Sequence, residues 1–593
     1  MQPQRYIKLI LPLRLEWEPC YSTAAELAIG ERVAVVFAHK RVIGVVSETD
    51  VTPDIDPSRI HSVLGVETGL EKISPEEISL WRFMAEYYLC SIGEVYKAAY
   101  PSLKTHSEES SARAQQRKEA LEELTLRRWQ DRLHKLQARL EARQKALEGR
   151  HNETVRLRLE GQRDAIIAEI REAEHKLASL SPELGIAEMD YSSLIAGIKA
   201  PAISKVLKDS LSTGKPLLLK SADRAASYVS AAAQCLRKGR NVFIMVNETA
   251  LATRLQERLE DAFGSLLLVH HSQQTNAARR RINDSVRSGR PYVLIGTRSS
   301  LFVPHKDLGL IIVENEESPF YKQSDTAPRY NARDCAVQLA RIHGCSLILG
   351  SCSPSLESLL NARSGRYSLL DMNPEGRQSH PGCRFTLIDV QAEKRKNGME
   401  GPFSRKLLKA MHFSGSTALI RGFEKEEELA GVQADIYTIP QAARSDLSAY
   451  SLVAMLSADA LFDPTDFRSD EHAFQFLERL KACCPQLMIQ SSQASHQAYL
   501  LPSAEPLLDE RRRFGLPPYT RLVDIRFKDA AAASGLAQKL TAGGFSTVAL
   551  WDTVRVTLPR DRQLLERKKE LRRCLEAFRS SSKATFVVDV DPI

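Results

Sequence analysis

The hydrophobic positions of this chain change their pattern along its length, and each change marks a different kind of predicted structure. Between residues 215 and 370, short apolar runs alternate with polar stretches of helix length; the runs are PLLLK, NVFIMVN, SLLLVHH, YVLIGT, LGLIIVE and CSLILGS. Such runs are typical of parallel strands covered by helices on both faces. We therefore predict an α/β sheet with its ligand site beyond the carboxyl ends of the strands.

From residue 107 to 182 the apolar residues instead recur at alternating spacings of three and four. One stripe contains Leu126, Trp129, Leu133, Leu136 and Leu140, and a second contains Ile166, Ile170, Ala173, Leu177 and Leu180. This is heptad spacing within a composition of strong helix formers. We favour an antiparallel helical hairpin (coiled coil) that reverses at GRHNET over one continuous rod.

The flanking regions carry other patterns. Residues 1–106 contain the β-type runs ERVAVVF and RVIGVVS before an apolar helical segment, which predicts a small β-rich domain. Residues 381–504 show a weaker α/β pattern, with STALIRG, SLVAMLS and PQLMIQS as strand candidates. Residues 505–593 end in the strand-like ATFVVDVDPI and are predicted to be an α+β domain. These boundaries leave 183–380 for the central α/β domain.

Composition narrows the class of protein. A net charge of +8 with 26% charged residues permits polyanion binding without indicating it. The ten cysteines are scattered, and the only close pair, Cys483 and Cys484, suits neither a zinc clip nor an oxidative framework. The opening apolar run is broken by Lys8, Pro12 and Arg14, and no apolar stretch of about 18 residues occurs. We expect a cytoplasmic protein with reduced thiols and no membrane span.

Several unusual sequence words resemble one known family in order and spacing. In the central region they are NETALATRL, GTRSSLFVP, LGLIIVENEESPFYKQ, PRYNARD and LILGSCSPSLESLLNA. These words are similar to the first helicase lobe of the primosomal protein N′ family, superfamily 2 DNA helicases of bacterial replication restart. GERVAVVF resembles its amino-terminal domain, ADALFDPTDFRSDEHAFQFL its second lobe and ERRRFGLPPYTRL its carboxyl-terminal domain. The helical hairpin has no match there.

The resemblance implies two RecA-like lobes, an amino-terminal domain that grips a 3′ end at a fork, and the use of ATP, magnesium and zinc. The phosphate loop departs from this pattern. Such a loop needs glycines for its backbone cradle, a lysine for the phosphates and a hydroxyl for magnesium. At this position the chain has Lys220, Ser221, Ala222, Asp223 and Arg224. We therefore predict a degenerate nucleotide-binding loop.

The catalytic motifs depart as well. Where the family has an Asp-Glu-Glu-His run, this chain has Glu314, Asn315, Glu316 and Glu317. Glu314 keeps a carboxylate for hydrated magnesium, but the amide of Asn315 cannot take a proton from water. ERLKACCPQ replaces the family's arginine-finger motif, Tyr437–Ile439 replace its Gly-Thr-Gln motif, and the paired cysteines of its zinc clusters are missing. No cofactor is expected.

Two groups of residues are candidates for DNA contact. The family's 3′-end pocket is also altered: this chain has Pro19, Cys20 and Tyr21 in place of a Phe-Asp-Tyr run, Ala38 in place of a glycine and His61 in place of a lysine. Tyr21 is expected either to stack on a terminal base or to pack in the β core. His61 is expected either to contact a phosphate when protonated or to be an ordinary surface histidine.

The second group matches the family's loop that senses single-stranded DNA: Phe320, Tyr321, Lys322, Arg329 and Tyr330. Aromatic rings interleaved with cations suit base stacking and phosphate tracking, although a structural contact between lobes is the alternative. Arg298 and Ser299 fall where the family touches the DNA backbone.

The preferred interpretation is a replication-restart-related protein that binds forked or single-stranded DNA without hydrolysing ATP, near the nucleoid and with primosome proteins as partners. The first alternative is an active 3′→5′ DNA helicase whose altered motifs still work. The second is a protein-interaction scaffold without DNA affinity. Salt-dependent DNA binding separates the preferred interpretation from the scaffold, because phosphate contacts release counterions and protein docking does not.

Overall fold

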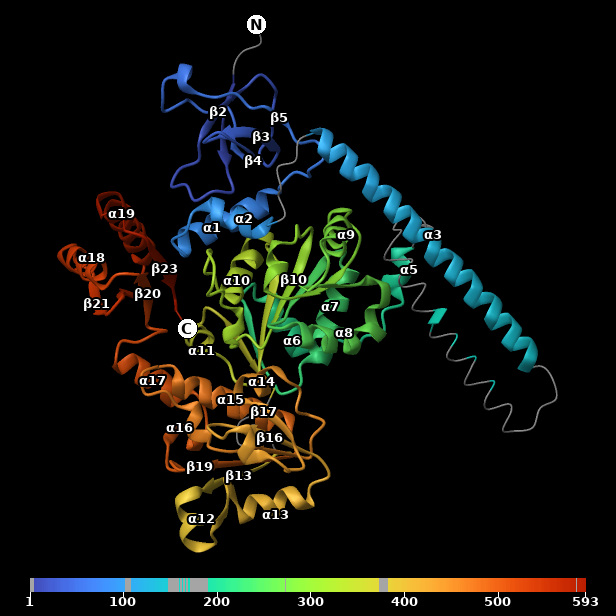
Figure 1. Ribbon diagram of the computed structural model, residues 1–593, viewed down its shortest axis with the longest axis vertical. Helices are drawn as coiled ribbons and strands as arrows, with labels where there is room; N and C mark the ends of the chain where they lie inside the picture. The colour runs from blue at the N-terminus through green and yellow to red at the C-terminus, as the bar shows by residue number, and fades with distance from the viewer. Residues whose placement is uncertain are drawn as a thin grey trace. The chain divides into compact units, whose positions relative to one another are not determined.

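A computed structural model describes residues 5–101, 108–147, 190–271, 273–372, 382–582 and 584–592, together with a few residues between 159 and 170 (Figure 1). By its internal contacts the chain divides into two compact units. The larger unit holds Met1–Pro101, Gly197–Gln274 and Arg281–Ile593, and the smaller holds Ser102–Ala196 and Thr275–Arg280.

The amino-terminal domain is an antiparallel sheet followed by two helices. Its strands lie in the order β2-β1-β4-β3-β5 and span Arg5–Ile10 (β1), Cys20–Thr23 (β2), Arg32–Phe37 (β3), Lys40–Glu48 (β4) and Gly65–Val66 (β5). Helices α1 (Pro75–Tyr87) and α2 (Ile92–Ala99) each begin with a capping box, formed by Ser74 with Glu77 and by Ser91 with Glu94. The predicted β-rich fold is therefore present.

Lobe 1, the central α/β domain, is built on a parallel 7-stranded sheet in the order β12-β6-β11-β10-β7-β9-β8. Its strands are β6 (Leu217–Lys220), β7 (Asn241–Met245), β8 (Leu267–His270), β9 (Val293–Gly296), β10 (Leu308–Glu314), β11 (Ser346–Ser351) and β12 (Ser368–Asp371). Its helices are α6 (Lys205–Ser212), α7 (Ala225–Arg237), α8 (Thr249–Phe263), α9 (Asn276–Arg287), α10 (Ala332–His343) and α11 (Leu356–Arg363). Every apolar run predicted as a strand forms one.

Lobe 2 repeats this architecture with a parallel 5-stranded sheet in the order β13-β19-β18-β16-β17. The strands are β13 (Arg384–Asp389), β16 (Thr417–Arg421), β17 (Asp435–Thr438), β18 (Leu452–Met455) and β19 (Gln486–Ser491), and β14 (Met399–Glu400) pairs separately with β15 (Phe403–Ser404). The helices are α12 (Val390–Lys396), α13 (Arg405–Phe413), α14 (Ile439–Arg444), α15 (Ser469–Cys483) and α16 (Gln497–Leu500).

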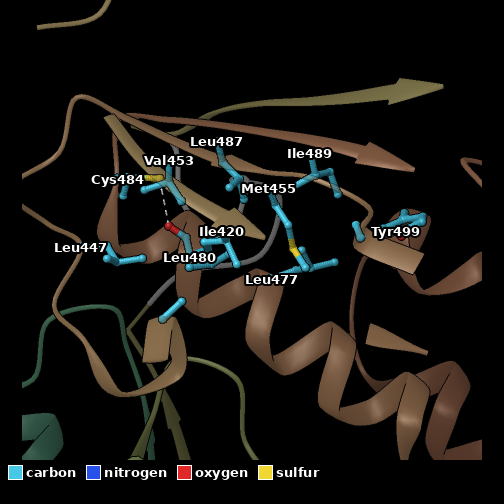
Figure 2. Close-up of a cluster of buried hydrophobic side chains, with 13 residues drawn as sticks. Ile420, Leu447, Val453, Met455, Leu477, Leu480, Cys484, Leu487, Ile489 and Tyr499 are labelled. Atoms are coloured by element: carbon cyan, nitrogen blue, oxygen red, sulfur yellow. Dashed lines mark hydrogen bonds between the residues drawn. The ribbon is translucent and has the colours of Figure 1, made fainter. Parts of the chain in front are cut away.

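The sheet of lobe 2 is buried on both faces. Along β18, Leu452 and Ala454 belong to one buried cluster, whereas Val453 and Met455 belong to the other, shown in Figure 2. Such two-sided burial is the reason the strand is apolar throughout rather than alternating. Both faces of this sheet therefore contribute to a hydrophobic core.

The carboxyl-terminal domain follows α17 (Glu505–Arg513). Its elements alternate as β20 (Thr520–Phe527), α18 (Ala530–Ala542), β21 (Ser546–Leu550), β22 (Thr553–Pro559), α19 (Leu564–Ser582) and β23 (Phe586–Val590). The antiparallel strands lie in the order β21-β22-β20-β23, which is a ferredoxin-like arrangement. The predicted α+β domain is present.

The smaller unit contains the long helix α3 (Glu108–Leu147) and the short helix α5 (Tyr191–Ala196). Leu136, Ile166 and Ile170 are buried together, and Arg139 pairs with Glu169 at 3.9 Å. A straight helix would separate Leu136 from Ile166 by about 45 Å, so these contacts exclude a continuous rod and agree with a hairpin. The reversal at 149–154, the stripe positions Ala173, Leu177 and Leu180, and the side chain of Leu126 lie outside the described residues. The coiled coil stays a prediction.

No helix within the described ranges is long and apolar enough to cross a membrane.

Candidate nucleotide site and nucleic-acid interface

The degenerate phosphate loop and the altered catalytic run meet at one edge of the lobe 1 sheet. The loop follows β6, and the run begins at the last residue of β10. Because β6, β11 and β10 are parallel neighbours, their carboxyl ends lie side by side (Figure 1). A Cβ on Gly350 of β11 would lie 1.7 Å from Tyr228 Oη, so this glycine leaves the room in which Tyr228 approaches Glu314.

Arg224 and Glu314 form a two-pronged ion pair at this edge. Arg224 Nε donates to Glu314 Oε2 at 2.9 Å and Arg224 Nη2 donates to Oε1 at 2.5 Å. Tyr228 Oη also donates to Glu314 Oε2 at 2.5 Å, and Asn315 Oδ1 accepts from Arg224 Nη2 at 2.9 Å. The side chains of Arg224 and Glu314 are only 7% and 13% exposed. Both carboxylate oxygens of Glu314 are thus occupied by side chains of the protein itself.

The carboxylate of Glu314 keeps the buried guanidinium of Arg224 charged. Burial acts to lower the pKa of Arg224, but the carboxylate of Glu314 and the phenol of Tyr228 raise it well above its usual value. Burial and the same carboxylate hold the pKa of Tyr228 well above its ordinary value. The cluster therefore carries one guanidinium, one carboxylate and one neutral phenol, all paired with one another.

The rest of the loop is also committed to internal contacts. Lys220 Nζ pairs with Asp371 Oδ2 at 2.9 Å, and Ser221 Oγ donates to the carbonyl of Asp223 at 2.8 Å. The Asp223 carboxylate caps α7 at Ala225 N and pairs with Arg258 at 3.0 Å, while Ala222 is exposed. The loop has no glycine to form a backbone cradle, and it carries the Asp223 carboxylate, which would repel phosphates. These residues therefore do not fit a nucleoside triphosphate with magnesium.

Glu316 and Glu317 also face inward. Glu316 is 1% exposed, and its oxygens accept from Ser355 N at 2.7 Å, Ser358 Oγ at 2.9 Å and Arg333 Nη1 at 3.2 Å. Glu316 thus fixes the start of α11 to β10. Burial and the neighbouring Glu316 raise the pKa of Glu317 to about 7. Asn315 has φ +53°, which is the left-handed region that asparagine tolerates better than most residues.

In the predicted DNA-sensing loop Tyr321, Lys322 and Tyr330 are buried, whereas residues 324–326 are exposed. Burial of these side chains does not favour base stacking or phosphate contact. Tyr321 is 0% exposed and donates its hydroxyl to the carbonyls of Met245 and Glu314 at 3.1 and 2.5 Å. Lys322 Nζ pairs with Asp589 Oδ1 at 2.8 Å and donates to the carbonyl of Val590 at 2.5 Å. These contacts favour a structural role, in which Lys322 ties lobe 1 to the carboxyl-terminal domain rather than to lobe 2.

The other predicted contacts of this region are likewise internal. Tyr330 is 5% exposed, and its ring lies edge-on to Phe302 with centroids 5.7 Å apart. Arg329 donates to the carbonyls of Ser324 and Asp325, which closes its own loop. These placements do not suit Tyr330 or Arg329 for DNA contact.

Arg298 and Ser299 support the same loop. Arg298 Nη1 donates to the carbonyls of Phe320 and Lys322 at 3.3 and 2.7 Å. Ser299 Oγ is buried and has no hydrogen-bond partner among the described residues. Phe320 is half-buried, with its ring 4.6 Å from the guanidinium of Arg444 in lobe 2. The contact between lobes that was the alternative for this loop is present.

Sequence reasoning missed a cavity between the two lobes. It measures about 290 Å³ and is lined by Asn247, Arg254, Asn315, Arg444 and Arg479, among others. Arg444 Nε pairs with Glu248 at 3.0 Å, Arg254 pairs with Asp446, and Arg479 donates to the carbonyls of Ala443 and Ser445. The sequence did not reveal Arg254, Arg444 and Arg479 as a group, because they lie on three separate helices, α8, α14 and α15.

Tyr21, a candidate for the 3′-end pocket, belongs to the core of the amino-terminal domain. Tyr21 is 3% exposed and donates its hydroxyl to the carbonyl of Val36 at 3.0 Å, so base stacking does not fit this placement. Its neighbour Ser22 donates its N–H to the carbonyl of His61 at 3.0 Å. The side chain of His61 and Ala38 are exposed. This surface therefore stays a candidate for DNA contact.

Comparisons with known proteins agree with the sequence words. Residues 8–101 match the family described as 3'DNA-binding domain (3'BD) of PriA. The chain is 26% identical to replication restart protein PriA of Haemophilus influenzae over 437 residues, which cover 70% of this chain and 58% of that protein. It is 36% identical to PriA of Chlamydia pneumoniae over 182 residues, covering 31% of this chain and 24% of that protein.

A search of solved structures matches the chain to RecG bound to a three-way DNA junction, with a TM-score of 0.32 and 14% identity over 55% of this chain and 46% of that chain. The helicase MrfA bound to DNA has a TM-score of 0.32 and 10% identity over 65% of this chain and 62% of that chain.

Replication restart protein PriA is the primosomal protein N′ of the sequence resemblance, and the matched segments span a quarter to somewhat more than half of these relatives. The resemblance predicted from the sequence is confirmed: this chain is similar to replication restart protein PriA, and its residues 8–101 match a family of 3′DNA-binding domains.

Proposed function

We propose that this chain is a replication-restart-related factor that binds forked or single-stranded DNA without hydrolysing ATP. The match of residues 8–101 to a 3′DNA-binding domain is the observation that supports DNA binding. The observation that supports the absence of hydrolysis is the buried pair of Arg224 and Glu314, which fills the edge of lobe 1 where a nucleotide would bind.

The argument against hydrolysis is electrostatic and geometric. Glu314 could hold hydrated magnesium only by releasing Arg224, which would leave a buried guanidinium without its carboxylate. Breaking a buried ion pair in this way costs about 3–5 kcal/mol. The loop offers no backbone cradle or free lysine in return, since Lys220 is paired with Asp371. We therefore derive no catalytic step at this site.

The DNA surface that we propose lies on the amino-terminal domain, around His61 and Ala38. We leave the loop of Tyr321 and Lys322 out of this surface, because Tyr321 is bonded within lobe 1 and Lys322 joins lobe 1 to the carboxyl-terminal domain. Other replication-restart proteins are the partners that the family resemblance implies, in the cytoplasm of a bacterium. We expect no zinc, because the paired cysteines of the family's zinc clusters are missing from the sequence.

Two measurements on the full chain test the proposal. The first is phosphate release from MgATP with saturating forked DNA; we expect none, and turnover of about 1 per second or faster would establish the active helicase instead. The second is anisotropy with forks whose recessed 3′ end carries either a hydroxyl or a phosphate, at two salt concentrations. We expect tighter, salt-dependent binding to the hydroxyl end. Binding to neither fork at low salt would favour the interaction scaffold.

A further inference from the structure

Two thiols of lobe 2 meet at the amino-terminal edge of its sheet. Cys383 immediately precedes β13, and Cys484 lies just before β19. These strands are parallel neighbours in which Arg384 is opposite Gln486, and Arg384 N donates to the carbonyl of Pro485 at 2.8 Å. This register places Cys383 opposite Pro485, the neighbour of Cys484, and Cys383 packs against the buried cluster to which Cys484 belongs. The chain has ten cysteines, but sequence spacing could not reveal this pair because its members are far apart in the chain.

The two thiols differ in exposure. Cys383 is half-buried at the border of the lobe 2 core. Cys484 is 5% exposed within that core, and its Sγ donates to the carbonyl of Leu480 at 3.1 Å, as the dashed line in Figure 2 shows. The single S–H proton of Cys484 can turn from this carbonyl to the sulfur of Cys383 when Cys383 is ionised.

The surroundings favour a thiolate on Cys383 rather than on Cys484. The hydrogen bond from Cys484 lowers the pKa of Cys383 against the effect of partial burial, and the Leu487 N–H and the Lys481 ammonium act in the same direction. The nearby Glu478 opposes them, and it pairs with Lys481 at 2.8 Å. The contact with Cys383, together with burial, raises the pKa of Cys484. A partly exposed thiolate beside a second thiol is the usual arrangement of a redox-sensitive cysteine.

We propose that Cys383 and Cys484 are a modification site, at which a small-molecule disulfide oxidises lobe 2 by forming an internal disulfide between them. The Cys383 thiolate attacks one sulfur of the small disulfide, which breaks its S–S bond and releases one thiolate. Cys484 then gives up its proton and attacks Cys383 Sγ, which releases the second small thiolate. The two protein thiols lose two electrons and two protons, and the small disulfide takes them up as two thiols.

The internal disulfide would join the first strand of lobe 2 to the segment between α15 and β19. It would close a loop that contains β16, β17 and β18 as well as α15. Closing a long loop restricts the unfolded chain, so oxidised lobe 2 is expected to resist denaturant better than the reduced lobe. This inference does not depend on the proposed DNA function.

The test is treatment of the reduced, folded full chain with oxidised glutathione, followed by blocking of free thiols and tryptic digestion without reductant. We expect a disulfide between QSHPGCR, which contains Cys383, and the peptide that begins ACCPQ. Because that second peptide holds both Cys483 and Cys484, variants decide between them. Cys483→Ser is the matched control and should keep the cross-link, whereas Cys484→Ser should stop at a glutathione adduct on Cys383.

A cross-link that persists in Cys484→Ser, or the absence of any cross-link in both the unsubstituted chain and Cys483→Ser, would overturn the proposal. Urea unfolding gives a second readout that does not depend on the variants. The midpoint of the oxidised chain should rise and should return to its reduced value after dithiothreitol; an unchanged midpoint in chains that carry the cross-link would refute the predicted effect on lobe 2.

Discussion

The amino-terminal domain and lobe 1 resemble the same family, but their predicted site residues differ in exposure. In the amino-terminal domain, His61 and Ala38 of the predicted pocket remain on the surface. In lobe 1, Glu314, Glu316, Tyr321 and Lys322 belong to family-like words, and all of them make contacts within the protein. A family-like sequence word can thus serve packing, and exposure separates such residues from those that remain candidates for ligand contact.

The electrostatics of the two regions differ accordingly. Lobe 1 holds several buried ion pairs, among them Arg224 with Glu314, Arg333 with Glu316 and Lys322 with Asp589. Each member of such a pair requires its partner, because an uncompensated buried charge is costly. Exposed charges in the amino-terminal domain can change at little cost in stability. Substitutions in lobe 1 should therefore act on stability, and substitutions around His61 on binding.

The largest expected effect is that of Lys322→Ala. The side chains of Lys322 and Asp589 are 1% and 4% exposed, so the substitution leaves a buried carboxylate without its ammonium. We expect the free energy of unfolding to fall by about 3–5 kcal/mol, measured by urea denaturation. DNA affinity per folded molecule should stay unchanged.

Lys528→Ala is the matched control, because Lys528 is exposed beside the same carboxyl-terminal sheet. It should change the free energy of unfolding by no more than about 0.5 kcal/mol. If Lys322→Ala instead lowered DNA affinity while leaving stability intact, the loop would be a DNA contact after all, and the contrast between the two regions would disappear.

The second prediction concerns the coupling between Arg224 and Glu314. Arg224→Met and Glu314→Leu should each destabilise the chain, and the double variant should lose less than their sum because no buried charge is left unpaired. We expect a coupling free energy of about 2–3 kcal/mol from a double-mutant cycle by urea denaturation. The exposed pair of Arg573 and Glu570, 3.1 Å apart, should show no measurable coupling in the same experiment. Additive effects at Arg224 and Glu314 would mean that the ion pair does not occupy the nucleotide site in solution.

The third prediction concerns acid and His305 in lobe 1. Burial lowers the pKa of His305 to about 3, whereas an unfolded histidine titrates near about 6.5. The unfolded state therefore takes up the proton first, so the stability due to a neutral His305 is complete above about pH 6.5 and is lost as the pH falls. The loss should approach about 1.4 kcal/mol per pH unit below about pH 6.

His305→Gln cannot titrate, and its free energy of unfolding should depend on pH less steeply by that amount between about pH 6 and 4. The exposed His39 provides the control, since His39→Gln should keep the slope of the original chain. Equal slopes in all three proteins would show that His305 is not buried in its neutral form.

The sequence predicted the fold well where burial is complete and poorly at the edges. Strands such as β10 and β18 are covered on both faces, so they appear as continuous apolar runs. In the parallel sheets of the two lobes, the strands that were missed, β12, β13 and β17, lie at sheet edges, where exposed residues interrupt the run.

The sequence placed the altered phosphate loop after β6 and the altered catalytic run at the end of β10, but it could not show which partners their side chains contact. Arg224 and Glu314 are 90 residues apart, and the distance in sequence between Lys322 and its acceptor Val590 is 268 residues. No local pattern states that such residues will meet. An aromatic and basic word also has the same composition whether it binds DNA or packs internally, so only the exposed fractions of Tyr321 and Lys322 distinguish the two.

The smallest expected effect is at His61, and it tests the other side of the contrast. Its side chain is exposed while its carbonyl accepts from Ser22, so the backbone should tolerate a new side chain. His61→Asp would place a negative charge where we propose that a DNA phosphate lies. Removing one phosphate contact should lower the slope of log affinity against log salt by about 1, without a change in the free energy of unfolding. The control is His412→Asp, the same substitution at an exposed histidine of lobe 2. Anisotropy titrations with a forked DNA at several salt concentrations compare the three proteins. Equal losses in both variants would indicate only a general charge effect, and no loss in either would remove this surface from the DNA interface. A loss of salt-dependent affinity confined to His61→Asp would show that the exposed surface around His61 in the amino-terminal domain contacts DNA.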